Sequence, residues 1–127
     1  MTLRRLFWTI AVSALDQPIF RSWFQWIWMH MIENLPVIYL RKTETLLAFH
    51  HPNPNHPVHI LLVPKRSITN MNELTESDSQ FLVDLFACVR SLVDEFGLAK
   101  KGYRLIANGG VYQEVPQLHF HLISEAS

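Results

Sequence analysis

Polar and apolar residues alternate strictly near the end of the chain, where positions 117–123 read Gln-Leu-His-Phe-His-Leu-Ile. Successive side chains of a β-strand point to opposite faces of a sheet, so this pattern predicts a strand with two chemically different faces. Gln117, His119 and His121 would share one face. The apolar residues between them would pack into a core, and these are Leu118, Phe120 and Leu122.

Further strands are predicted from short apolar or alternating runs at 37–42, 44–50, 58–63 and 103–107. The nearly continuous apolar run at 58–63 is typical of a buried central strand. The run of Pro and Asn at 52–57 predicts a loop, and Asn108-Gly109-Gly110 predicts a turn.

One long helix is predicted between these strands. Its apolar residues recur at three- and four-residue spacing and form one stripe, which consists of Phe81, Leu82, Leu85, Val89, Leu92, Val93 and Phe96. Thr75 or Ser77 is the expected N-cap, with Gln80 placed for a capping box behind Ser77, and Gly97 is expected to end the helix. Together the elements predict an α+β fold, a mainly antiparallel five-stranded sheet with one long helix across it.

The first 35 residues differ in composition, since they hold all four tryptophans and three of the four methionines. Two helices are expected there, separated by Asp16-Gln17-Pro18. Packing within the domain or in a dimer is the favoured interpretation, and a helix lying on a membrane surface is the main alternative. A transmembrane span is rejected because the apolar runs are too short, and a secretory signal is a weak alternative. The chain therefore divides into a helical extension, 1–35, and a domain, 36–127.

Composition narrows the function. The 127 residues are 49% hydrophobic and include 11 acidic and 11 basic side chains, so the formal net charge is zero. This suits one globular domain and gives no basic surface for a nucleic-acid partner. A small anionic ligand held by local dipoles remains compatible. The lone Cys88 lies in the apolar helical pattern, which indicates a buried thiol in a cytoplasmic protein.

The alternating segment resembles the signature of the histidine triad (HIT) family of nucleotide-binding proteins, His-φ-His-φ-His-φ-φ with φ apolar, with Gln117 in place of the first histidine. The similarity covers roughly residues 37–124. It includes Leu47-Ala48-Phe49-His50, His59-Ile60-Leu61-Leu62-Val63-Pro64-Lys65, Lys101-Gly102-Tyr103-Arg104-Leu105, Asn108 and Gln113. The resemblance implies a HIT-like fold, nearest the family's nucleoside phosphoramidase branch.

The resemblance also implies catalytic roles. In the family the middle histidine attacks an α-phosphorus and forms a nucleotidyl-histidine that water resolves, so His119 would be the nucleophile. A backbone carbonyl would fix its tautomer. His121 and His59 would flank the phosphate and donate N–H groups to its oxygens or a proton to the leaving group. Gln117 keeps a hydrogen-bonding amide but cannot transfer a proton. No cofactor or metal is implied.

Substrate-binding residues follow by the same comparison. Gln113 and the backbone amides near Glu114 would complete an anion pocket, with Asn108 nearby. His50 has a counterpart near the family's nucleoside pocket. His51 stands where phosphoramidases hold an acidic residue against the ribose. The alternative for both histidines, and for His56, is a solvated imidazole in or beside a loop.

Three functions remain open. The leading hypothesis is an enzyme that hydrolyses or transfers a nucleoside monophosphate, with a purine base, from a phosphoramidate or dinucleoside polyphosphate. The second is a nucleotide-binding or interaction module with vestigial catalysis. The third is a structural role or a zinc site built from His59, His119 and His121. Family members commonly dimerise, and the surplus apolar area of the extension also favours a homodimer.

Overall fold

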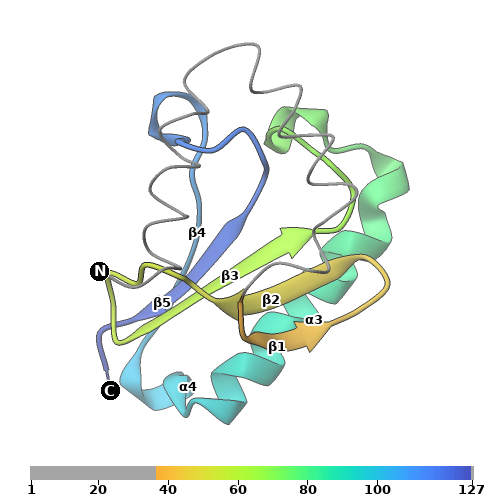
Figure 1. The fold of residues 1–127 in the computed structure, drawn as a ribbon. Coiled ribbons are helices and arrows are strands. Elements are labelled where there is room, and N and C mark those ends of the chain that lie inside the picture. Colours follow the sequence, from red (N-terminus) through yellow and green to blue (C-terminus); the bar gives the residue numbers. More distant parts are fainter. Residues whose placement is uncertain (1–36, 127) are drawn as a thin grey trace.

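A computed structural model describes residues 37–126, so the two helices predicted for residues 1–35, with the contacts expected of them, lie outside the described part of the chain. Within that part, one sheet contains β1 (Tyr39–Lys42), β2 (Leu46–His50), β3 (Val58–Pro64), β4 (Arg104–Ala107) and β5 (Phe120–Ser124). The strand order is β1-β2-β3-β5-β4, and all neighbours are antiparallel (Figure 1). The strand β5 is therefore interior, and β4 forms an edge.

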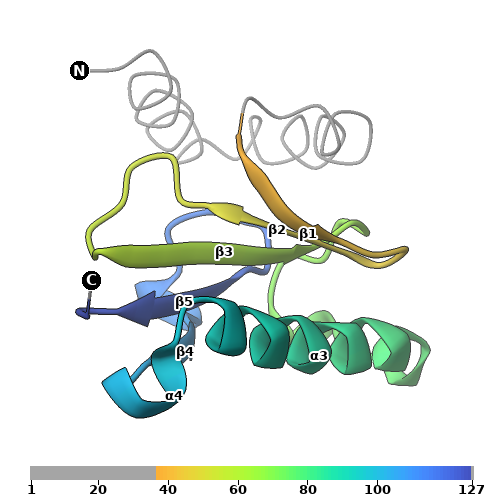
Figure 2. The same ribbon diagram turned by 90° about the horizontal axis from the view of Figure 1, so that it is seen from below.

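The long helix α3 (Ser79–Glu95) and the one-turn helix α4 (Leu98–Lys101) lie along the same face of the sheet (Figure 2). Gly97 between them has a φ of 64°, in the left-handed region that favours glycine, and it ends α3 as predicted. The predicted α+β fold is confirmed. The helix α4 was not expected from the pattern.

The start of α3 differs from one of the two predictions. A 3-10 turn, Glu76–Asp78, precedes the helix, and Thr75 is its N-cap. The backbone N–H of Thr75 donates to the carboxylate of Asp78 at 3.0 Å. The box predicted from Ser77 and Gln80 is wrong, because Gln80 donates its amide to a carboxylate further along α3. The Asp78 carboxylate, three residues after Thr75, already accepts the hydrogen bond from the N-cap N–H.

The last strand is shorter than predicted, because residues 117–119 precede β5 as irregular backbone. The N–H of Leu118 donates to the carbonyl of Ile68 at 2.7 Å, outside the sheet. The strand β3, which pairs with β5, ends at Pro64, and proline has no N–H to continue the hydrogen bonds between the two strands. The alternation of buried and site-facing side chains runs from Leu118 to Leu122, whereas the Gln117 side chain is buried.

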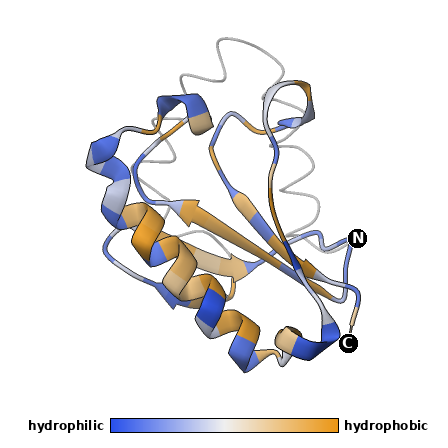
Figure 3. Cartoon of the chain, turned by 180° about the vertical axis from the view of Figure 1, so that it is seen from behind, coloured by the Kyte–Doolittle hydropathy of each residue, from blue (hydrophilic) through white to orange (hydrophobic). Residues whose placement is uncertain are grey.

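The sheet buries apolar side chains on both faces. The main core lies between the sheet and α3, and its fully buried members include Leu46, Ala48, Ile60, Leu62, Leu85, Leu92 and Leu122. The central strands are hydrophobic over most of their length, whereas α3 alternates hydrophobic and hydrophilic segments (Figure 3). This matches the predicted single stripe on the helix.

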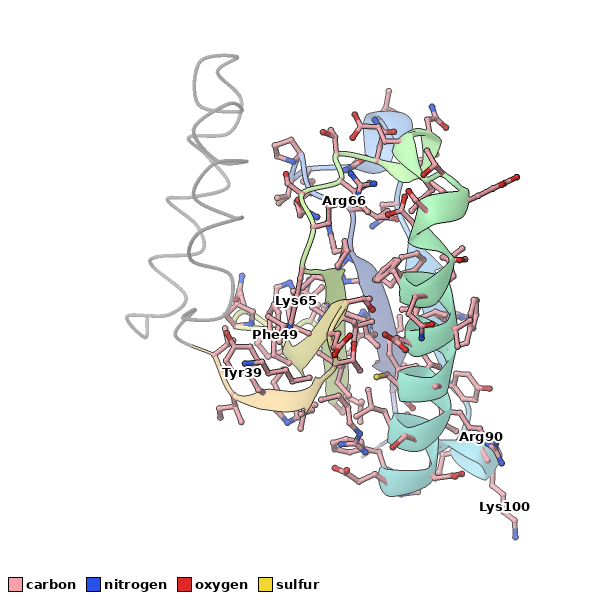
Figure 4. All side chains as sticks on the ribbon, turned by 90° about the vertical axis from the view of Figure 1, so that its right-hand side faces the viewer. Tyr39, Phe49, Lys65, Arg66, Arg90 and Lys100 are labelled. Atoms are coloured by element: carbon pink, nitrogen blue, oxygen red, sulfur yellow. The ribbon has the colours of Figure 1, made fainter. Side chains whose placement is uncertain are left out.

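The face away from α3 carries a smaller apolar cluster, formed by Leu47, Phe49, Leu61 and Val63 with Val37 and Tyr39 packed on it. The rings of Tyr39 and Phe49 meet edge to face at 6.1 Å on this side of the sheet (Figure 4). By strand alternation the histidines of β3 and β5 share this second face. Within residues 37–126, no helix has the length and apolar character needed to cross a bilayer.

The core makes a simple prediction for stability. Leu85 is fully buried on α3, whereas Val111, in the turn Gly110–Tyr112 beyond β4, is 97% exposed. We expect Leu85→Ala to lower the free energy of unfolding by about 2–5 kcal/mol, because it opens a cavity. The matched change Val111→Ala should cost less than about 0.5 kcal/mol. Urea unfolding followed by circular dichroism measures both, and equal losses would contradict the assigned packing.

Candidate active site

Four imidazoles lie in one row on the sheet face away from α3, and we call them the imidazole row. His51 follows β2, His59 belongs to β3, His119 precedes β5 and His121 lies within it. Ring centroids are 4.3 Å apart for His51 and His59, 5.2 Å for His59 and His121, and 4.9 Å for His121 and His119. The row runs across the sheet because β3 pairs directly with β5.

Hydrogen bonds determine where His59 and His121 carry their protons. The backbone N–H of Asn55 donates to Nδ1 of His59 at 3.1 Å, so the proton of this neutral ring is on Nε2. That nitrogen lies 2.9 Å from Nδ1 of His121 and donates to it. Since Nδ1 of His121 is an acceptor, the N–H of His121 is on Nε2.

His119 has the opposite tautomer. Its Nδ1 lies 2.7 Å from the backbone carbonyl of Gln117, and a carbonyl can only accept a hydrogen bond. The proton is therefore on Nδ1, and the lone pair is on Nε2. A neutral imidazole held in this way has one nitrogen available for nucleophilic attack.

His51 extends the row where the resemblance implies an acidic residue. Its Nδ1 accepts a hydrogen bond from the backbone N–H of Asn53 at 2.9 Å. Its ring stacks on His59 with an interplanar angle of 30°. The position thus holds a ring with a fixed tautomer, and no carboxylate is supplied there.

Burial keeps the imidazole row neutral. Desolvation is the main reason that the pKa of His51 falls to about 3 and those of His59 and His121 to about 4, and neighbouring imidazoles lower them further. Burial also lowers the pKa of His119, although the hydrogen bond to Gln117 and the charge of Glu114 oppose that shift. All four rings are neutral at pH 7, as the tautomers above require.

The side chains of two glutamines near the row form hydrogen bonds with neighbouring loops. Gln117 is 1% exposed, and its side-chain oxygen lies 3.4 Å from the hydroxyl of Ser67, so what it presents to His119 is its backbone carbonyl. Gln113 donates its amide to the carbonyls of Thr69 at 2.6 Å and Val115 at 2.9 Å. The Gln113 side chain thereby stabilises the turn before residues 117–123.

Two further predicted residues lie between β4 and the signature segment. Glu114 is exposed, and its charge acts on the His119 ring. Asn108 is exposed one residue beyond β4. Ala107 lies opposite Phe120 in the sheet, so Asn108 comes directly after the last paired residue of β4.

The structure does not bring His50 to the row. Its ring meets that of Phe96, at the end of α3, edge to face at 6.0 Å. The reason is strand alternation, since Phe49 packs on the second face and its neighbour His50 points the other way. The expected place of His50 in the nucleoside site is therefore corrected.

The loop 52–57 was missed as part of the site. Its backbone N–H groups fix the tautomers of His51 and His59. Because nearly every residue has a backbone N–H, the residue types in the loop do not reveal this role. His56 lies in the same loop, 5.2 Å from His59 between ring centroids, and its Nδ1 pairs with the carboxylate of Glu125. The sequence feature that could have indicated this role was the run of Pro and Asn shortly before His59.

The ring nitrogens do not converge on an ion. Nε2 of His59 and Nδ1 of His121 point at each other and share a proton. Within residues 37–126, no group of three or more His, Cys, Asp or Glu side chains could hold a metal ion. The geometry does not support the zinc alternative.

A profile of the HIT domain matches residues 33–127. The chain belongs to the HIT family. An uncharacterised HIT-like protein of Helicobacter pylori is 34% identical over 93 residues, which cover 72% of this chain and 86% of the relative. The HIT profile thus covers the whole described part of the chain. The match also covers most of the length of the relative.

Solved structures of HIT proteins share the fold. A HIT family hydrolase from Clostridium thermocellum matches with a TM-score of 0.69 and 38% identity, over 77% of this chain and 88% of that one. A histidine triad nucleotide-binding protein from Candida albicans matches with a TM-score of 0.65 and 25% identity, over 76% and 71% of the two chains. The fold of this chain is HIT-like.

The lowered pKa values predict a loss of stability in acid. A histidine in the unfolded chain has a pKa of about 6.5, whereas that of His59 is about 4 in the folded protein. The unfolded state therefore binds more protons, and the free energy of unfolding falls as the pH drops from about 6.5 towards 4. His59 alone contributes at most about 3 kcal/mol to this loss. We would measure the free energy of unfolding with urea across this pH range. It should depend less steeply on pH for His59→Gln than for the parent. Identical pH dependence in the two proteins would refute the lowered pKa of His59.

Proposed function

We propose that the chain is a nucleotide-binding hydrolase or transferase that acts at the α-phosphate of a nucleoside phosphoramidate or dinucleoside polyphosphate. The observation that carries this proposal is the pair of opposite tautomers, with a lone pair on Nε2 of His119 and an N–H on Nε2 of His121. The names of two HIT structures, a hydrolase and a nucleotide-binding protein, support the same class of activity. The resemblance to phosphoramidases supports the substrate class.

The reaction has two displacements. Nε2 of His119 attacks the α-phosphorus, a P–N bond forms, and the bond to the leaving group breaks with its electron pair on that group. A water oxygen or another acceptor hydroxyl then attacks the same phosphorus, the P–N bond breaks to return the lone pair to Nε2, and the proton of the attacking oxygen is released to solvent. The carbonyl of Gln117 accepts from Nδ1 and stabilises the positive charge that develops on the ring.

His121 fits the role of a hydrogen-bond donor better than that of a general acid. With a pKa of about 4, it is protonated in only about one molecule in a thousand at pH 7 in the free protein. Its neutral Nε2–H can still stabilise a phosphoryl oxygen as charge develops. The favoured leaving groups are therefore those that need no proton from the protein, such as a polyphosphate or an amine already protonated on the substrate.

The nucleoside would extend from the row towards the apolar cluster. Phe49, Leu61 and His121 follow one another across β2, β3 and β5, so this cluster borders the row directly. An apolar border suits a purine better than a charged group. His51 is neutral at pH 7, and it would hold ribose hydroxyls less strongly than the carboxylate expected at that position.

A nucleotide-binding module with vestigial catalysis is the second candidate. Gln117 supports it, because a buried amide cannot shuttle a proton at the first signature position. Such a module would bind AMP at the row without turning over a phosphoramidate.

Removal of the nucleophile tests the enzyme directly. AMP release from adenosine phosphoramidate would be followed in the presence of chelator. We expect His119→Ala to reduce kcat by at least about a thousandfold, because no other group can form the P–N bond. We expect His121→Ala to reduce it by about 100-fold to 1,000-fold through loss of one donor.

The control for these variants is His50→Ala, which removes an imidazole from the opposite face and should keep the parental kcat. Turnover by His119→Ala equal to that of the parent would remove the enzyme assignment. AMP binding by calorimetry without turnover in the parent would favour the module.

We also propose that the protein is a homodimer. The outward face of α3 exposes Val83 and Phe86, each 61% accessible. The strand β4 leaves one backbone edge unpaired within residues 37–126, and Tyr103 beside it is 47% exposed. An exposed apolar helix face beside an open sheet edge suits a second copy of the same chain.

Light scattering tests the dimer. We expect the parent to have the mass of two chains and Phe86→Glu to shift towards one, because the charge would be buried at the contact. Met71→Glu is the matched control, since Met71 is 51% exposed in a 3-10 turn outside α3. A parent mass of one chain at all concentrations would refute the proposal.

A further inference from the structure

The loop 52–57 holds two rings of the imidazole row in their tautomers. Asn53 and Asn55 donate backbone N–H groups to Nδ1 of His51 and of His59, at 2.9 Å and 3.1 Å. If the loop moved away, each Nδ1 would lose its donor and each ring could hold its proton on either nitrogen. The chemistry of the row therefore depends on the conformation of a surface loop.

Glu125, just beyond β5, ties the loop to that strand. Nδ1 of His56 donates to the carboxylate of Glu125. The backbone around Glu125 is itself fixed, because the hydroxyl of Ser124 donates to the carbonyl of Gly102 at 2.6 Å and accepts from the N–H of Ala126 at 3.2 Å. The pair thus links the loop to the strand that carries His121.

The pair also lies directly against the row. The ring of His56 meets that of His59 edge to face, with centroids 5.2 Å apart and an interplanar angle of 69°. His56 is next to Asn55, whose N–H is the donor to His59. A displacement of His56 would therefore move both the ring that abuts His59 and the amide that fixes its tautomer.

We propose that His56 and Glu125 form a latch that positions the row. The latch keeps the N–H of Asn55 on Nδ1 of His59, so that the proton of His59 stays on Nε2 and faces His121. Neither residue of the latch is a catalytic residue, since each acts through the loop. The consequence for turnover rests on the proposed function, whereas the consequence for the tautomer does not.

The test compares Glu125→Ala with the parent at one pH near neutrality. Loss of an exposed ion pair shifts a local equilibrium modestly, so we expect hydrogen exchange at the amides of Asn53 and Asn55 to accelerate about two- to tenfold. The ring ¹⁵N shifts of His59 should move from a single Nε2–H tautomer towards an average of two. With adenosine phosphoramidate, kcat should fall by a similar factor while KM changes less than about twofold, because the latch does not touch the substrate.

Two further variants complete the design. Glu125→Gln keeps an acceptor for His56 and should recover part of the loss. Glu44→Ala removes an exposed carboxylate from the turn between β1 and β2, and it should match the parent in every measurement. Parental exchange rates and a parental His59 tautomer in Glu125→Ala would overturn the latch. A parent that releases no AMP would overturn the proposed function instead, and the NMR measurements would still decide the latch.

Discussion

The hydrogen bond from Nε2 of His59 to Nδ1 of His121 requires that Nδ1 of His121 carry no proton. A proton on Nδ1 of His121 would place two N–H groups against each other across 2.9 Å. Desolvation on the second face of the sheet prevents this by holding both pKa values near 4. The remaining N–H of His121 is then on Nε2, where it complements the lone pair of His119. Burial, more than any single partner, defines the chemistry of the row.

The strand pattern predicted which side chains gather on the second face, because a period of two is a geometric property of the extended backbone. His59, His119 and His121 came together for this reason. The contribution of the loop 52–57 could not be predicted, since its donors are backbone amides that every residue except proline has. His50 shows a further limit. A short similarity to a family strand identifies the strand, whereas only the pairing of β2 in the sheet decides which face each side chain takes.

Gln117 has separate backbone and side-chain roles in this structure. The carbonyl that fixes His119 belongs to the backbone, so it does not depend on which side chain stands at position 117. The side chain is buried and reaches the hydroxyl of Ser67. The position thus combines a backbone role that does not depend on residue type with a side-chain role that does.

The segment around β5 alternates core and site residues without a gap. Leu118, Phe120 and Leu122 pack towards α3, and the two imidazoles between them face the other way. Because the side-chain period is two, one inserted or deleted residue here would turn the imidazoles into the apolar core and expose the aromatic ring. The segment therefore tolerates an exchange of side chains better than a change of length, and an inserted residue fits only in the turns on either side.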